Sequence, residues 1–376
     1  MTDSLHLVRD RVVARAPQLV EVSHEIWDHP ELCFEEHRAH DLLVTQLAGA
    51  GLDVTPGAFG LDTAFVAEAG TEGPVVAVIC EYDALPGIGH ACGHNVIAAA
   101  GLGAGLALAE LADDLGGRVR ILGTPAEEGG GGKEFMIRAG AFDGVDAAVM
   151  VHPADRNLPT MEAIAVHQVH ARYRGSAAHA AAAPHEGRNA LDAAVLGYVN
   201  VAALRQHIQT HERIHGVFTD GGSKPNIVPD RASTHWYVRS GTRSSLDELE
   251  PRVASCLEAG ALATGCEVDL EWVDPAYDEM VHDDWLLDRF AQHAADLGRE
   301  LEDPAIDGPI VGSTDMGNVS RRVPSIHPMV AVAPRGVPIH TPDFATAARS
   351  AAGDRAAVDG AVLLAATAVD RWTRDR

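Results

Sequence analysis

The chain has 376 residues, 46% of them hydrophobic and 22% charged, which is the composition of a globular protein. At roughly 100 to 200 residues per domain, this length predicts two or three domains. A net charge of -25 makes approach to phosphate backbones repulsive, so we expect no nucleic-acid partner. No stretch reaches the roughly 20 apolar residues of a membrane span, and the N-terminal segment is typical of an amphipathic helix rather than a signal peptide. We therefore expect a cytoplasmic protein without membrane contact.

The first half of the sequence alternates predicted strands and helices. Strands are expected at 61–69, 75–80, 119–124 and 147–152, and helices at 95–111 and 132–139. This rhythm predicts an α/β sheet covered by helices. Open α/β sheets bind ligands at the carboxyl ends of their strands, and polar motifs follow three of these strands.

The pattern changes near residue 166. From there the order is strand, helix, strand, strand, helix, strand, ending near residue 270. Such a unit forms a compact α+β domain, which we place at 166–275. It would be inserted into a catalytic domain made of 1–165 and 276–376.

Three residue types stand out by number. The five cysteines are scattered and odd in number, which argues against a disulfide framework. Only two of the 29 basic residues are lysines, Lys133 and Lys224, which we attribute to coding bias. The 20 histidines are abundant, and several lie in glycine-rich turns where packing does not explain them. The search for chemistry therefore starts from the histidines.

The densest polar motif is EYDALPGIGHACGHN, which follows the strand expected at 75–80. Cys92 and His94 are two residues apart, so in an extended or turning segment both side chains face the same way and can share a metal ion. A Cys-x-His pair also occurs by chance, and Asn95 is suited to be the N-cap of the next helix. The motif alone leaves a metal site and a plain turn open.

Two adjacent carboxylates, Glu127 and Glu128, follow the strand expected at 119–124 and precede four glycines. Glycine loses more conformational freedom on ordering than any other residue, so four of them are a costly way to build a plain turn. Adjacent glutamates can divide two roles, one as a metal ligand and the other as a general base. A solvated acidic turn is the alternative.

Two more histidines follow predicted strands or lie in late turns, His152 in VHP and His340 in VPIHTP. Each alone is compatible with an ordinary hydrogen-bonded histidine. Together with Cys92, His94 and Glu128 they supply five ligands, enough for two metal ions if one ligand bridges. A thiolate with imidazoles favours Zn²⁺, with Mn²⁺ or Co²⁺ as alternatives, over Mg²⁺ or Ca²⁺.

These motifs resemble the dinuclear metallopeptidase family of aminoacylases and glutamate carboxypeptidases, in particular its amidohydrolase branch with Xaa-Arg dipeptidase and aminobenzoyl-glutamate hydrolase. The matching segments run in order along nearly the whole chain: EYDALPGIGHACGHN, TPAEEGGGGK, VHP, GSAAHAA, PNIVPD and HTPDF. The resemblance implies a zinc-peptidase-like catalytic domain with a mixed sheet flanked by helices. It also implies that the inserted domain acts as a lid and carries the contacts of a homodimer.

The resemblance implies a role for each candidate residue of the catalytic domain. Cys92 would bridge two divalent metal ions, with Glu128 and His340 completing one site and His94 and His152 the other. Glu127 would be the general base that activates water. Asp83 would orient a ligating imidazole; without the resemblance it is a turn residue.

Three residues of the insert receive roles from the same resemblance. His179 would stabilise the oxyanion across the dimer interface, Asn226 would contact the substrate, and Arg239 would bind a substrate carboxylate. Without the resemblance they are a loop histidine, a turn asparagine and a surface arginine.

One motif departs from the classical members, which carry His-x-Asp where this chain has Glu81, Tyr82 and Asp83. The first histidine ligand is therefore missing, and His94 must replace it. The sequence thus predicts a metal-dependent amidohydrolase acting on an N-acyl amino acid or dipeptide with a free carboxylate. The alternatives are a metal-free thiol hydrolase with Cys92 as nucleophile and His94 as base, and a catalytically silent protein of the same fold.

Overall fold

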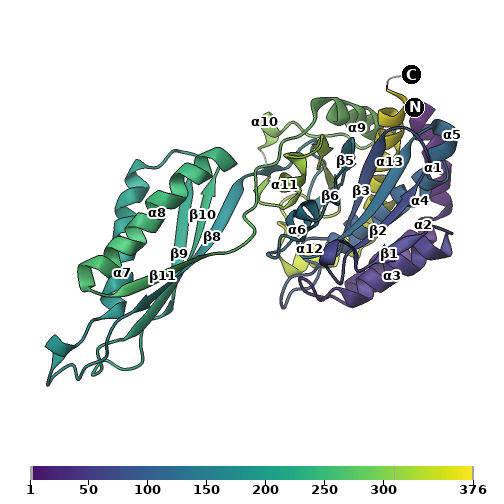
Figure 1. Cartoon of the computed structure of the whole chain (residues 1–376). Helices are drawn as coiled ribbons and strands as arrows, with labels where there is room; N and C mark the ends of the chain where they lie inside the picture. Colours follow the sequence, from purple (N-terminus) through teal and green to yellow (C-terminus); the bar gives the residue numbers. More distant parts are fainter. Residues whose placement is uncertain (1–2, 309, 375–376) are drawn as a thin grey trace. The chain divides into compact units, whose positions relative to one another are not determined.

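A computed structural model describes residues 3–308 and 310–374 of the chain. The chain divides into two compact units, the first made of Met1–Glu162 and Met280–Arg376 and the second of Ala163–Glu279. Figure 1 shows a helix-covered sheet in the first unit and a sheet with two long helices in the second.

The first unit is built on a six-stranded mixed sheet. Its strand order is β1-β2-β4-β3-β5-β13, and β4, β3, β5 and β13 are parallel neighbours, whereas β2 runs antiparallel to both β1 and β4. The parallel strands place their carboxyl ends at one edge of the sheet. The strands are β1 Val54–Pro56, β2 Phe65–Ala69, β3 Val75–Glu81, β4 Arg118–Thr124, β5 Ala147–Val149 and β13 Ser325–Ile326. This mixed α/β sheet confirms the predicted fold class.

Strand β3 shows why this sheet is covered on both faces. All seven of its residues are buried, as expected for a strand between two helical layers. Val76 and Val78 pack into the core with α4 (His94–Ala109) and α13 (Ala351–Thr373), whereas Ala77 packs on the opposite face with residues of α6 and α11. Gly101 of α4 permits the close approach to β3, because a Cβ there would lie 2.4 Å from the carbonyl oxygen of Ile79.

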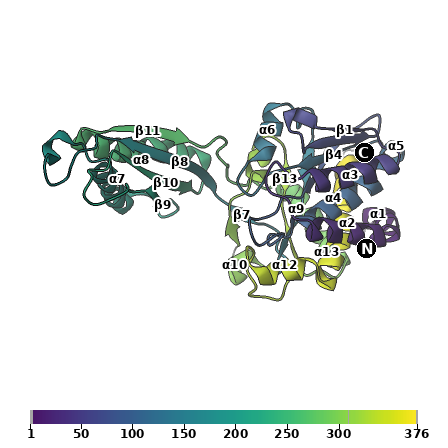
Figure 2. The same cartoon turned by 90° about the horizontal axis from the view of Figure 1, so that it is seen from below.

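The remaining helices of the first unit complete these layers. Helices α1 and α2 contact α4, and α1 and α4 both contact α13 (Figure 2). Their bounds are α1 Asp3–Ala14, α2 Ala16–Asp28, α3 His37–Gly49, η1 Ala58–Gly60, α5 Ala112–Leu115, α6 Gly132–Arg138, α9 Asp284–Asp296, α10 Pro304–Asp307, α11 Met316–Ser320 and α12 Pro342–Ala348. Among the described residues, no helix combines the length and apolar character needed to span a bilayer.

Three details differ from the sequence predictions. The strand expected at 61–69 is only β2, and the one expected at 147–152 ends with β5 before a separate strand, β6 (His152–Ala154), begins. Asn95 is not the N-cap, because α4 begins one residue earlier and Gly93, at φ 81°, precedes it. A Cβ at Gly93 would lie 2.8 Å from the ring of Pro153, so this turn requires glycine. The Asn95 side chain instead donates to Ser23 Oγ at 2.8 Å.

The second unit follows the predicted order of strand, helix, strand, strand, helix, strand. Its antiparallel sheet has the order β11-β8-β10-β9, so β9 is an edge strand, and α7 and α8 pack on one face (Figure 1). The elements are β8 Ala165–Arg174, η2 Pro184–Glu186, α7 Ala190–Leu204, η3 Arg205–His207, β9 Arg213–Asp220, β10 Arg231–Ser240, α8 Arg243–Thr264 and β11 Glu267–Trp272. Three further short strands lie outside this sheet: β12 Val311–Gly312 and β14 Met329–Ala331 in the first unit, and β7 Glu162–Ala163 at the boundary along the chain.

Candidate active site

The candidate ligands of the first unit meet at the carboxyl edge of its parallel strands. Asp83 follows β3, Glu127 and Glu128 follow β4, and His152 follows β5. The chain then brings Cys92 and His94 to the same edge at the start of α4, and the backbone N–H of His340 donates to the carbonyl of Ala91 at 2.8 Å. The fold therefore gathers segments that are far apart in the sequence.

The ligand atoms form two groups that share one thiol. Cys92, His94 and His152 make the first group, and Cys92, Glu128 and His340 the second, with all ligand atoms of a group within 4.8 Å of one another. Cys92 Sγ lies 3.5 Å from His152 Nε2, and His340 Nε2 lies 3.5 Å from Glu128 Oε1. Two groups with a common thiol indicate a centre for two metal ions.

Asp83 orders both halves of this centre. Its Oδ1 accepts a hydrogen bond from His94 Nδ1 at 3.0 Å, and its Oδ2 accepts one from the backbone N–H of Glu128 at 2.9 Å. Burial alone would raise the pKa of Asp83, but the hydrogen bond and charge of His94 outweigh it and lower this pKa to about 2. An ionised Asp83 leaves Nε2 of His94 as the nitrogen that faces the site.

His152 is oriented in a similar way. Its Nδ1–H donates to the carbonyl of Pro153 at 2.7 Å, which leaves Nε2 toward Cys92. Burial raises the pKa of Cys92, and the nearby Glu128 raises it further. Both a nucleophile and a metal ligand must be the thiolate, so Cys92 would need a positive group such as a divalent cation to lower this pKa.

The charge of the site fits divalent cations. Five buried or nearly buried carboxyl groups gather at this edge of the sheet, and Lys133 forms ion pairs with two of them. Burial with mutual repulsion raises the pKa of Glu127 and Glu81. Within the described residues, the buried His94 Nε2 has no hydrogen-bond partner. Thiol, imidazole and carboxylate donors are those that zinc, manganese and cobalt accept. The five carboxyl groups are those of Glu81, Asp83, Glu127, Glu128 and Asp315.

Residues 40–368 match the sequence profile of Peptidase family M20/M25/M40. The chain belongs to this family. It is 42% identical over 378 residues to Xaa-Arg dipeptidase of Mus musculus, covering 96% of this chain and 87% of that protein. It is 36% identical over 290 residues to a component of the p-aminobenzoyl-glutamate hydrolase of Escherichia coli, covering 72% of this chain and 60% of that protein.

Solved structures agree with this fold. A dinuclear metal binding peptidase of family M20 from Bacillus subtilis aligns with a TM-score of 0.73 at 21% identity, covering 96% of this chain and 99% of that one. An aminobenzoyl-glutamate utilization protein from Klebsiella pneumoniae aligns with a TM-score of 0.78 at 19% identity, covering 98% and 99%. The resemblance seen in the motifs is confirmed. This M20 peptidase is a metal-dependent hydrolase of amide bonds, and nothing in these likenesses favours a silent protein.

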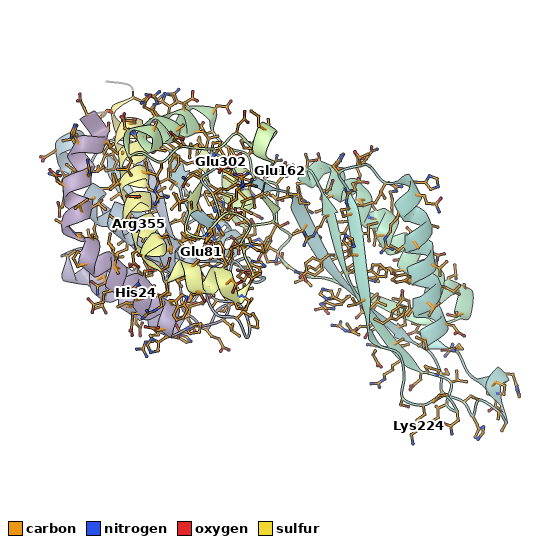
Figure 3. The ribbon with its side chains drawn as sticks, turned by 180° about the vertical axis from the view of Figure 1, so that it is seen from behind. His24, Glu81, Glu162, Lys224, Glu302 and Arg355 are labelled. Carbon is orange, nitrogen blue, oxygen red and sulfur yellow. The ribbon has the colours of Figure 1, made fainter. Side chains whose placement is uncertain are left out.

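The second unit of this M20 peptidase separates its three candidate residues into two places. His179 and Asn226 lie on adjoining exposed loops, where the N–H of Ala180 donates to the carbonyl of Asn226 at 3.1 Å. Nδ1 of His179 accepts from the backbone N–H of Ala182 at 3.1 Å, so Nε2 carries the proton and is a donor. This loop end also holds Lys224 (Figure 3).

Arg239 lies near the other end of β10. Its guanidinium is 5.5 Å from the ring centre of Tyr237, and both line a cavity of about 550 Å³ with His215 and His235. Arg231 and Arg239 are eight residue steps apart along the extended strand, which is about 26 Å. The structure therefore brings His179 and Asn226 together but keeps Arg239 apart from them.

Sequence reasoning missed a second set of buried residues. Lys133 forms an ion pair with Glu81 and donates to Asp315 Oδ1 at 2.7 Å. The attraction of both carboxylates outweighs burial and raises the pKa of Lys133, so it is cationic. The scarcity of lysines was interpreted only as coding bias, and no role was predicted for Lys133, which is fully buried and paired. Its being one of two lysines was the available signal.

Glu36 is the other missed residue. Its carboxylate accepts hydrogen bonds from the backbone N–H groups of Phe34 and Ala126, each at 2.9 Å, and from Thr63 Oγ1 at 2.8 Å. Both backbone donors have positive φ, 64° at Phe34 and 62° at Ala126. Glu36 therefore stabilises the strained turn that presents Glu127. No local sequence motif indicates this role.

Proposed function

We propose that this M20-family chain hydrolyses the amide bond of dipeptides or N-acyl amino acids that carry a free carboxylate. The names of two relatives support this substrate class. Xaa-Arg and p-aminobenzoyl-glutamate both contain an amide whose nitrogen belongs to an amino acid. A third relative, 31% identical over 68% of this chain, is an N-acetyl-L-cysteine deacetylase of Bacillus subtilis.

The observation that carries the proposal is Glu127 beside two ligand groups that share Cys92. In this assignment Glu128 and His340 complete one metal site, and His94 and His152 the other. We assign Zn²⁺ as the metal, with Mn²⁺ or Co²⁺ as alternatives. When bound, two such ions polarise an amide carbonyl and lower the pKa of water.

Glu127 performs the proton transfers. It is 8% exposed, and its burial close to Glu81 and Glu128 raises its pKa, which suits a group that must both accept and release a proton. Glu127 takes a proton from the attacking water as the oxygen adds to the carbonyl carbon. It then gives that proton to the amide nitrogen as the C–N bond breaks, and the products are a carboxylic acid and an amine.

Arg239 supplies recognition of the substrate carboxylate. A guanidinium can donate two parallel hydrogen bonds to a carboxylate, and the neighbouring Tyr237 ring restricts its position. The cavity of about 550 Å³ beside it has room for an amino-acid side chain. The second unit would therefore select substrates by their free carboxylate.

The separation within the second unit supports a homodimer. A dipeptide spans about 7 Å, whereas about 26 Å of β10 lie between Arg231, on the side of His179, and Arg239. One copy of the unit cannot place both ends of β10 on one such substrate, so His179 and Asn226 would come from a second copy. The edge strand β9 exposes Val217 and Phe218, and α7 exposes further apolar side chains, which together suit a dimer contact.

Metal analysis tests the proposed function. The purified chain is measured for metal by elemental analysis, then chelated, then reloaded with Zn²⁺ or Mn²⁺, and assayed on Xaa-Arg, Xaa-Lys and p-aminobenzoyl-glutamate. We expect about two equivalents per chain, loss of hydrolysis on chelation and recovery on reloading. A matched dipeptide amide, which lacks the carboxylate, should be a poor substrate. Full hydrolysis by metal-free protein would overturn the mechanism.

A further inference from the structure

Glu81 ends β3 at the centre of the site but lies outside the five assigned ligands. Its side chain is fully buried, as are those of Lys133 and Asp315. Oε2 of Glu81 accepts from the Lys133 ammonium, which also donates to Asp315 Oδ1 at 2.7 Å. Asp315 Oδ2 accepts the backbone N–H of Lys133 at 2.9 Å. These contacts fix the position of the Glu81 carboxylate.

The other oxygen of Glu81 has a different environment. Oε1 forms no hydrogen bond with any residue that the structure describes, although it is fully buried. It lies 3.2 Å from His94 Nε2, which also lacks a hydrogen bond within the same part of the chain. A buried carboxylate oxygen without a donor is strongly unfavourable unless another positive group satisfies it.

His94 Nε2 and Glu81 Oε1 lie within ion-pair distance, but no hydrogen bond joins them. An imidazole N–H lies in the ring plane, and despite the 3.2 Å separation its direction does not meet Oε1 in a hydrogen bond. Two donor atoms that bind the same metal ion have a different geometry. With bonds of about 2.1 Å and a near-tetrahedral angle they lie about 3.2 to 3.5 Å apart, and neither points at the other.

A third group of ligand atoms supports the same interpretation. Glu81, His94 and Glu127 place their ligand atoms within 4.8 Å of one another, and His94 also belongs to the group with Cys92 and His152. We propose that Glu81 Oε1 is a further ligand of the ion held by His94, and that Lys133 and Asp315 position it. This inference rests on the metal assignment of the proposed function. A carboxylate oxygen makes this site harder, which favours retention of Mn²⁺ or Co²⁺ beside Zn²⁺.

The test measures metal coordination rather than catalytic activity. Wild type and Glu81→Gln are loaded with Zn²⁺, and the mean number of oxygen, nitrogen and sulfur ligands is measured by X-ray absorption, with affinities from chelator competition. We expect the variant to lose oxygen coordination and to bind one of its two ions at least tenfold more weakly. An unchanged ligand count with unchanged affinity would overturn the proposal.

Two further variants separate ligation from the loss of a buried charge. Glu81→Asp keeps the negative charge opposite Lys133 but withdraws the oxygen by one methylene, and should reproduce the loss even if Glu81→Gln does not fold. Glu36→Gln is the matched control, because it neutralises a buried carboxyl group whose hydrogen bonds go to Phe34, Thr63 and Ala126 and not to the Lys133 network. It should keep the wild-type ligand count. An equal loss in Glu36→Gln would overturn direct ligation, and a wild type that binds no metal would overturn the proposed function as well.

Discussion

The two units of this M20 peptidase hold their candidate residues in opposite ways. In the first unit His94 is fully buried and Glu127 only 8% exposed, and Asp83 and Glu36 fix the segments that carry them. In the second unit His179 and Asn226 are exposed and lie on loops. The residues proposed for the chemistry are therefore held in a core, whereas those proposed to contact the substrate lie on an exposed surface.

Neutralising the buried base is the strongest test of the role assigned to the first unit. Glu127→Gln should lower kcat by about 10³-fold or more, because an amide cannot carry out the proton transfers proposed for the carboxyl group. Elemental analysis should still find the wild-type metal content, since Glu127 is not one of the five assigned ligands. Activity within tenfold of wild type would remove Glu127 from its role.

The corresponding change in the second unit is His179→Ala, with an expected loss in kcat of about 10²- to 10³-fold from the missing oxyanion donor. Mixing it with Glu127→Gln distinguishes one chain from two. If His179 acts across a dimer, subunit exchange should restore about a quarter of wild-type activity, because half of the dimers are mixed and each has one intact site. A mixture that stays inactive after proven exchange would place His179 in its own chain's site.

Glu36 tests how strongly burial in the first unit makes folding stability depend on pH. Burial, with the charge of Asp83, raises the pKa of Glu36 to about 7. The folded state therefore binds this proton more tightly than the unfolded state. The contribution of Glu36 to the free energy of unfolding is greatest below about pH 4.5 and is lost as the pH rises through 7. Glu36→Gln should remove up to about 3 kcal/mol of that pH dependence. Urea midpoints at pH 5 and pH 8 measure it, and parallel curves for variant and wild type would contradict the assignment.

The smallest expected effect belongs to the exposed cavity of the second unit. Arg239→Ala should raise KM for carboxylate-bearing substrates by about ten- to a hundredfold, as expected for loss of a charged hydrogen bond. The metal content should not change. A dipeptide amide should show little difference between variant and wild type, and an unchanged KM for the free acid would exclude Arg239 from the site.

The parts that sequence predicts well are those in which one short segment carries several clues. Cys92 and His94 lie in one motif after β3, and Glu127 and Glu128 in another after β4, so strand-end logic alone brings them to one edge. The fold class followed from the same alternation of strands and helices. The order of strands and helices in the inserted domain was also predicted, because these segments have clear lengths and hydrophobic periods.

The missed residues have their partners far away in the chain. Lys133 pairs with Glu81, 52 positions away, and with Asp315, 182 positions away. Such a buried pair is defined only by packing, because each charged residue alone is typical of a surface. The N-cap at Asn95 failed for a similar reason. Propensity favours asparagine there, but the contact of Gly93 with Pro153 moved the start of the helix.

His340 differs from the other imidazoles of the centre, because its side chain is 49% exposed whereas that of His94 is fully buried. In the proposed assignment, the exposed His340 would give one of the two ions a path to solvent, whereas the buried pair of His94 and His152 would give the other none of its own. The two ions should therefore exchange at different rates. The outer ion would follow the metal supply of its surroundings, while the inner ion would keep the identity that it had when the chain folded.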